Sequence, residues 1–189
     1  DGSWLLTDLL RGRFGTEWAT GLHAGADRLV ALDRSALSFL SVNSSTIGLS
    51  RLWKGVTVGQ LLDAAPPLPF TYRGANLKPL APVYLNGNRN PSTNDWSLDW
   101  IRRTRLGGEW RDAVDASLGE TAESYEIEVW TSGFAALKRT LTATTPTVAY
   151  TSAQQVTDFG SNQATLSLKI YQLSSVVGRG TALTTTITR

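Results

Sequence analysis

The fold is decided by the stretch Tyr125-Glu126-Ile127-Glu128-Val129, in which apolar and charged side chains alternate. The same alternation occurs in Trp96-Ser97-Leu98-Asp99-Trp100 and in Leu166-Ser167-Leu168-Lys169-Ile170. A Thr-rich run with one apolar face follows at Leu183-Thr184-Thr185-Thr186-Ile187. Because successive side chains of a strand point to opposite faces, a period of two predicts strands that bury one face. Six side chains are therefore expected inside: Leu98, Trp100, Tyr125, Ile127, Leu168 and Ile170.

Turn signals that contain glycine separate these stretches. They are Asn86-Gly87-Asn88, Gly107-Gly108, Ser132-Gly133, Gly160-Ser161-Asn162 and Gly178-Arg179-Gly180. Ser152-Ala153-Gln154-Gln155 has the S-x-x-Q pattern of a capping box and predicts the start of one short helical turn. Short alternating strands at regular spacing over about 110 residues favour a seven-strand antiparallel β-sandwich.

The composition also favours an all-β chain. Of the 189 residues, 41% are hydrophobic and 18% are charged, against roughly 25% charged residues in a usual soluble domain. The polar surface comes instead from 23 Thr and 17 Ser, which together with 17 Gly favour strands and turns over long helices. A coiled coil, a helical bundle and a disordered tail are excluded.

Prolines mark the expected boundary between two parts of the chain. Three of them fall in Pro66-Pro67-Leu68-Pro69, which favours an extended connector, because proline cannot continue a helix or a central strand. We predict a first part at 1–63, a Pro-rich linker at 64–78 and the sandwich at 79–189.

The first part is rich in glycine and is expected to contain only short elements. Strands are predicted within 28–32 and 49–58, and one helical turn is predicted at Thr16-Glu17-Trp18-Ala19 with Thr16 as its cap. So little regular structure cannot hide the apolar side chains of 1–63, which we therefore expect to be the remnant of a small β-domain that begins upstream of Asp1. The chain contains no Met, even at position 1, which fits a segment of a longer polypeptide or a processed product.

The order of the predicted strands resembles a fibronectin type III (FnIII) domain. Trp100 stands where that family has a core Trp on its second strand, 125–129 is similar to its third strand, and 166–188 is similar to its last hairpin. The resemblance implies an FnIII-like β-sandwich. One feature departs from the family, since Ala164-Thr165 stands where a tyrosine is usual near the start of the penultimate strand. That corner is expected to be held in another way.

Three further stretches resemble tail-tip and baseplate hub proteins of long-tailed bacteriophages, in particular the host-specificity protein of gene transfer agents and related siphophages. They are Leu9-Leu10-Arg11-Gly12-Arg13-Phe14-Gly15-Thr16-Glu17, Tyr72-Arg73-Gly74-Ala75-Asn76-Leu77-Lys78-Pro79-Leu80-Ala81-Pro82-Val83, and Asp99-Trp100-Ile101-Arg102-Arg103-Thr104-Arg105 followed by Gly108-Glu109-Trp110. The resemblance implies a non-enzymatic virion component at the distal tail, the C-terminal region of a hub that assembles as a homotrimer. Other tail-tip proteins, tail fibres and a host-surface glycan are the partners that it implies.

A rival interpretation is a carbohydrate-binding or spacer module of a secreted bacterial glycosidase, in which such sandwiches also occur. Two tryptophans are candidates for partner or glycan contact under either interpretation. Trp110 follows Gly107-Gly108 and Trp130 ends a predicted strand, and aromatic rings at such positions can be exposed. Core or subunit packing is the alternative role for both.

No residue is predicted to be catalytic, to bind a cofactor or to ligate a metal. His23 is the only histidine, and Asp27 could orient it in a triad, but no G-x-S-x-G motif accompanies it. One His and no Cys leave a zinc site with carboxylates alone.

Glu126 and Glu128 share a strand face about 7 Å apart, a separation that a glycosidase could use. The simpler interpretation is that both lie on the solvent-exposed side of the strand and pair with arginines across the sheet. Cross-strand ion pairing is likewise expected for Arg102, Arg103 and Arg105. A hairpin turn is expected at 178–180 instead of a phosphate loop, because no Lys-Ser/Thr and helix follow it.

Charge and hydropathy disfavour two further classes of protein. The net charge is +2, and basic and acidic residues are evenly spread, which disfavours a nucleic-acid-binding face. No run approaches the roughly 18 apolar residues of a membrane span, and no signal-peptide pattern occurs.

Overall fold

The computed structural model describes residues 5–33, 35, 37–109 and 112–189. The chain forms two compact units, one of Asp1–Ala26 with Lys78–Arg189 and the other of Asp27–Leu77. The boundaries predicted from the prolines stay a prediction. The second unit ends next to the end of the predicted linker, whereas no proline marks its beginning near residue 27.

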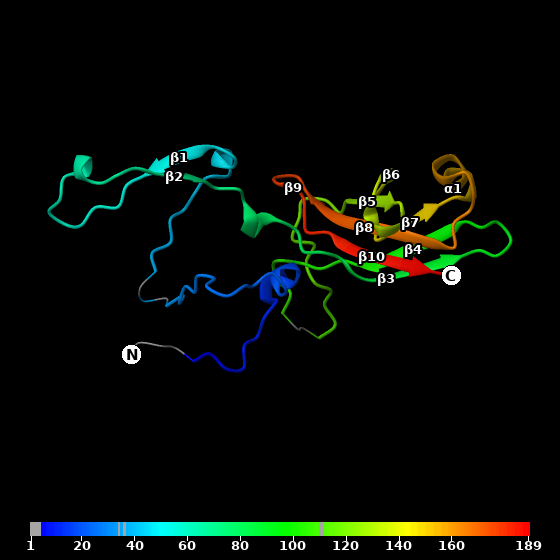
Figure 1. The fold of residues 1–189 in the computed structure, drawn as a ribbon, viewed down its shortest axis with the longest axis horizontal. Coiled ribbons are helices and arrows are strands. Elements are labelled where there is room, and N and C mark those ends of the chain that lie inside the picture. Colours follow the sequence, from blue (N-terminus) through cyan, green and yellow to red (C-terminus); the bar gives the residue numbers. More distant parts are fainter. Residues whose placement is uncertain (1–4, 34, 36, 110–111) are drawn as a thin grey trace. The chain divides into compact units, whose positions relative to one another are not determined.

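The described residues of the larger unit form two antiparallel sheets, with seven strands of four or more residues and the two-residue β9 (Figure 1). One sheet has the order β3-β4-β7 and the other has the order β10-β8-β5-β6, with the two-residue β9 paired to the end of β8. The strands are β3 (Val83–Arg89), β4 (Trp96–Ile101), β5 (Tyr125–Trp130), β6 (Leu137–Ala143), β7 (Thr147–Tyr150), β8 (Thr165–Ser174), β9 (Gly178–Arg179) and β10 (Leu183–Thr188). The chain changes sheet after β4, β6 and β7, so the prediction of an antiparallel sandwich is confirmed, with β9 added to the seven expected strands.

The core lies between the two sheets and follows the predicted alternation. In β4 the burial alternates strictly from Trp96 to Ile101, and β5 is central, so that Ile127 faces both Leu141 and Ile170. Trp100 packs edge-on against Tyr125, with ring centroids 5.1 Å apart. All six side chains predicted to be inside are buried. The structure adds four large apolar side chains that join them: Trp96, Val129, Tyr150 and Leu166.

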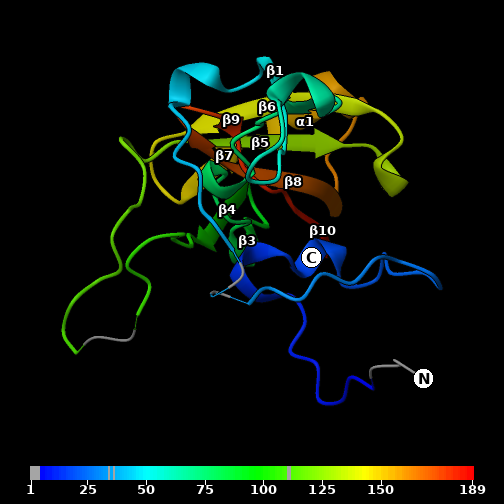
Figure 2. The same cartoon turned by 90° about the vertical axis from the view of Figure 1, so that its left-hand side faces the viewer.

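The helix α1 (Ser152–Phe159) lies between β7 and β8, beside β6 (Figure 2). Its cap is Thr151, and its capping box joins Thr151 to Gln154, one residue earlier than predicted. The prediction of one short turn is also wrong, because this box and the left-handed Gly160 at the other end support eight residues.

Gln155 of α1 holds the corner where FnIII domains usually have a tyrosine. Its buried amide donates to the carbonyl oxygens of Asn94 (2.8 Å) and Tyr150 (3.2 Å), and its oxygen accepts from the Gln163 N–H (2.9 Å). The indole of Trp96 donates to the Gln163 carbonyl at 3.0 Å. A buried amide that bonds three backbone groups thus fixes the corner, as expected from the missing tyrosine.

The N-terminal part of this unit contains two 3-10 turns, η1 (Arg13–Gly15) and η2 (Glu17–Ala19). Gly15 has φ 79° and lies against Leu80, so a side chain at this position would meet both backbone strain and a clash. Thr16 precedes η2 as predicted, but its hydroxyl donates to the Arg13 carbonyl (2.8 Å) instead of capping the turn. A further 3-10 turn, η6 (Ser132–Phe134), links β5 to β6.

The smaller unit, 27–77, has one antiparallel pair of strands, β1 (Ser50–Trp53) and β2 (Leu68–Thr71). Three 3-10 turns complete it: η3 (Ser44–Thr46), η4 (Leu62–Ala64) and η5 (Ala75–Leu77). The strand predicted within 49–58 is confirmed in β1. The strand predicted within 28–32 is wrong, because these residues have no paired neighbour and form no regular element. β2 lies inside the Pro-rich stretch.

No helix in the described residues is long and apolar enough to cross a membrane.

Candidate functional site

The outer face of the β10-β8-β5-β6 sheet carries a cluster of charged and aromatic side chains around Arg179. Its guanidinium binds both glutamates of β5, through Nε to Glu126 and through Nη1 to Glu128 Oε1 at 2.7 Å. The same guanidinium lies over the Tyr171 ring, 4.6 Å from its centroid. The second oxygen of Glu128 accepts from Trp130 Nε1 (3.0 Å) and the Tyr171 hydroxyl (3.3 Å).

These contacts make Glu128 a structural carboxylate. The residue is 4% exposed, so the expectation that both glutamates lie on the solvent-exposed side of the strand is wrong for Glu128. The expected arginine partner exists, but it comes from β9. Burial and the charge of Glu128 raise the pKa of Tyr171. Three donors thus hold this one carboxylate, Arg179 on one oxygen and Trp130 and Tyr171 on the other.

Trp130 is half-buried within the same face. The Lys169 ammonium lies 4.4 Å from the Trp130 ring centroid and 5.6 Å from that of Phe134, and the indole N–H is bonded to Glu128. The ring is therefore held by cation–π and hydrogen-bond contacts of its own sheet. The proposed partner or glycan contact at Trp130 stays a prediction. Trp110, the other candidate, lies outside the described residues.

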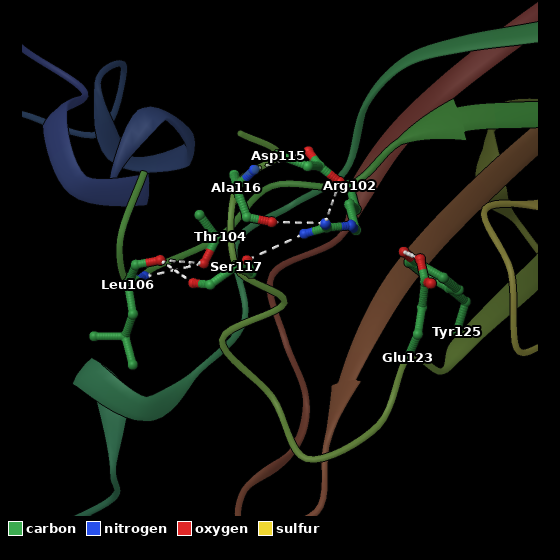
Figure 3. A network of polar contacts seen from close by, with 8 residues as sticks. All are labelled: Arg102, Thr104, Leu106, Asp115, Ala116, Ser117, Glu123 and Tyr125. Carbon is green, nitrogen blue, oxygen red and sulfur yellow. Dashed lines mark hydrogen bonds and ion pairs between the residues drawn. The ribbon is translucent and has the colours of Figure 1, made fainter. Parts of the chain in front are cut away.

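Between β4 and β5 lies the segment 102–124, in which Arg102 joins the first residue after β4 to 115–117 (Figure 3). Arg102 donates to the carbonyl oxygens of Ser117 (3.1 Å) and Ala116 (2.7 Å) and pairs with Asp115 at 3.0 Å. Within the loop, the hydroxyls of Thr104 (2.6 Å) and Ser117 (2.8 Å) both donate to the Leu106 carbonyl. These contacts give the two ends of the loop a defined course.

Arg105 likewise finds its partners within the segment, whereas Arg103 reaches outside it. Arg103 donates to the Ala81 carbonyl (2.7 Å) and pairs with Glu17 (2.7 Å), while Arg105 pairs with the nearly buried Glu120 at 3.1 Å. The pKa of Glu17 is lowered, chiefly by its hydrogen bond from Arg103. The expectation of cross-strand pairing is wrong for all three, because they follow the last residue of β4, where no neighbouring strand faces them.

A second ionic cluster joins α1 to β6. Asp158 accepts from Arg139 Nε (2.6 Å) and Nη2 (2.8 Å) and from the Tyr150 hydroxyl (2.7 Å). Burial alone would raise the pKa of Asp158, but these hydrogen bonds outweigh it and lower the pKa. The bidentate hydrogen bonding of Arg139 to Asp158 fixes α1 against β6.

The unit 27–77 exposes a large apolar surface. Phe39 (83% exposed), Leu52 (71%) and Phe70 (58%) belong to it, and Ala65 is the one buried apolar residue described in this unit. A hollow of about 580 Å³ runs beside β2 and is lined mainly by apolar side chains, among them Leu40, Trp53 and Phe70. Exposed patches of this kind are sites of protein association.

His23, the single histidine of the sequence, is exposed to solvent. Among the described residues, no group of three or more His, Cys, Asp or Glu side chains could hold a metal ion.

No family model matches the chain, and neither does any curated protein. Solved structures do. Domains d3-d4 of the rat CD45 extracellular region share 12% identity over 88% of this chain and 78% of that chain, with a TM-score of 0.41. The FN5 domain of Drosophila Lar (14% identity, 58% of this chain, 95% of that chain) gives 0.35, and a human fourth FNIII domain (14%, 59%, 78%) gives 0.39.

The class of the larger unit follows from its own strand order, three strands packed on four with the chain crossing between sheets, which is that of an FnIII-like β-sandwich.

Proposed function

We propose that this chain is a non-enzymatic structural component of the tail tip of a phage or gene transfer agent, part of the baseplate hub at the distal end of the tail. Its work is to assemble the distal tail and to contribute to fibre docking or host recognition. The three stretches that resemble hub proteins suggest this identity. The apolar surface of 27–77 carries the role in assembly.

Within its described residues, the unit 27–77 has almost no buried core, with Ala65 as the one buried apolar residue. A two-stranded ribbon alone is marginally stable in water, and the exposed rings of Phe39 and Phe70 add a penalty for solvent contact. Such a unit becomes stable when another surface covers it. In the hub, the covering surface is another part of the polypeptide, a neighbouring tail-tip protein or a further copy of the chain.

The sandwich suits a recognition role in the same assembly. Its sheets are rigid, while in the loop 102–124 Arg102 and Arg105 join the two ends to each other, so that the sequence between them can vary. The rival carbohydrate-binding function has less support, because Lys169 covers the ring of Trp130 and Glu128 takes its N–H.

A direct test locates the protein in particles. Antibodies against 27–77 and against the sandwich are applied to purified tailed particles of the source and viewed by electron microscopy. Label at the distal tail is expected. Label confined to cells or secreted material, with none on particles, contradicts the proposal.

The assembly role has a separate test. Residues 1–189 alone are expected to form assemblies larger than a dimer or to aggregate, whereas 72–189 should stay soluble and associate no further than a dimer by light scattering. A full chain that is monodisperse, monomeric and unfolds cooperatively would contradict the assembly argument.

A further inference from the structure

The free edge of β10 differs from the other three sheet edges of the sandwich. Edge strands normally carry charges, bulges, proline or short lengths, which prevent pairing with another chain. β6 carries Lys138 and Arg139, β3 has a register shift between Val83 and Asn86, and β7 has only four residues. β10 reads Leu-Thr-Thr-Thr-Ile-Thr and pairs with β8 over six residues without a shift.

The register identifies which backbone groups of β10 are free. Arg189 N–H donates to the Ala164 carbonyl at 3.0 Å, and this pair continues the β10–β8 register. Because hydrogen-bonded pairs alternate along an antiparallel ladder, Leu183, Thr185 and Ile187 bond to β8. The N–H and C=O groups of Thr184, Thr186 and Thr188 therefore point toward the open edge, where no described residue pairs with them.

The charge nearest to this edge is turned away from it. Arg189 follows β10 directly, but its Nε donates to the Gly87 carbonyl (2.8 Å) and its Nη2 to Asn86 (3.4 Å), both on β3. The edge is thus uncharged, unshifted and made of residues with high β propensity, which is a template for adding a strand.

We propose that β10 pairs antiparallel with β10 of a second copy of this chain across a two-fold axis centred on Thr186. Thr186 then faces Thr186 of the other copy, and Thr184 faces Thr188. Every free N–H and C=O of these three residues finds a partner, and the pairing brings no like charges together. The strand is self-complementary, as a two-fold contact requires.

The threonine side chains fit the same arrangement. On the side of β8, the hydroxyl of Thr188 bonds to Thr165 (3.1 Å) and that of Thr186 lies 3.3 Å from Ser167. Cross-strand threonine pairs stabilise antiparallel sheets, so the second copy extends a hydroxyl array that already exists. A hollow of about 430 Å³, lined by Thr184 and Trp18 among others, lies at the start of β10.

Single cysteines test the pairing in the full chain, which has no cysteine of its own. Directly opposed residues of a hydrogen-bonded pair lie about 5.5 Å apart, within the range of a disulfide. Thr186→Cys is therefore expected to form a covalent dimer under mild oxidation, about tenfold or more faster than Thr142→Cys. Thr142 is a matched control, because it is an exposed threonine on the outer face of β6.

The register gives a second measurement. Thr184→Cys and Thr188→Cys alone should crosslink no faster than the control, while their mixture should crosslink as fast as Thr186→Cys. When Thr186→Lys is added to both cysteine variants of the mixture, it sets two positive charges opposite each other and should abolish crosslinking. Thr142→Lys added in the same way should leave crosslinking unchanged.

The proposal is overturned if Thr186→Cys crosslinks no faster than Thr142→Cys, or if Thr184→Cys alone dimerises as readily as the mixture. Association through 27–77 would raise the oligomeric state without bringing two copies of residue 186 together. Failure here and failure of the proposed function are therefore distinguishable.

Discussion

The two units of this chain use similar residues with opposite results. The sandwich buries a core that includes Trp96, Trp100 and Tyr125, whereas 27–77 leaves Leu52, Leu68 and Phe70 in solvent. The difference lies in closure. Two sheets packed face to face can hide one face of each strand, but the pair of four-residue strands described in 27–77 has no second sheet within its own unit. Apolar content alone therefore does not make a core.

Hydrogen exchange should give the largest contrast between the units. Amides of β5, which is paired on both sides, are expected to exchange at least about 10⁴-fold more slowly than amides of β1 and β2, because β5 opens only by global unfolding. The measurement is exchange followed by mass spectrometry on freshly diluted chain. Equal protection in both units would show that 27–77 is stable unaided.

The second largest contrast between the units is expected in the free energy of unfolding after substitution of a tryptophan. Trp100→Ala is expected to cost ~3–5 kcal/mol in the free energy of unfolding, since it leaves a cavity beside Tyr125. Trp53→Ala in the smaller unit, 38% exposed, should change the sandwich transition by less than about 0.5 kcal/mol. Urea denaturation followed by far-UV circular dichroism measures both. Similar costs would remove the distinction between the units.

The Arg179 cluster should contribute less than the apolar core. Arg179→Ala leaves the buried Glu128 with only Trp130 and Tyr171 as donors and is expected to cost about 2 kcal/mol. Glu128→Gln added to this variant should recover part of the loss, because it removes the unpaired charge. Chemical denaturation of both variants and of the unaltered chain gives the coupling energy. Additive losses would mean that the pair is not coupled.

The smallest effect is a dependence on pH. The pKa of Asp158 is lowered in the folded chain, so its contribution is present above its unfolded pKa, near 3.9, and is lost as pH falls through the folded value. Asp158→Asn should be less stable by about 1 kcal/mol at pH 7, and the difference should shrink below about pH 4. Thermal unfolding from pH 2 to pH 7 checks it. A difference that is constant with pH would contradict the role of the charge.

Prediction of the site from sequence succeeded where contacts are local. Strand alternation placed Trp100 and Ile127 in the core, because the period of two is a property of the backbone. An arginine partner of Glu128 was expected, but its identity was missed, since Arg179 lies far from Glu128 in the chain and reaches it only through the pairing of β9 with β8. Thr151, not Ser152, caps α1, a shift of one residue that the S-x-x-Q pattern alone could not resolve.

The sequence by itself determined the all-β class, the strands of the sandwich and the residues of its core, because side-chain periodicity and turn residues act over a few positions. Only the tertiary structure decided that Glu128 is buried and bonded, that Gln155 holds the corner without a tyrosine, and that the edge of β10 is free. Each of these depends on which strands lie side by side, and that follows from the packing of the whole sandwich, where distant segments compete for the same interior.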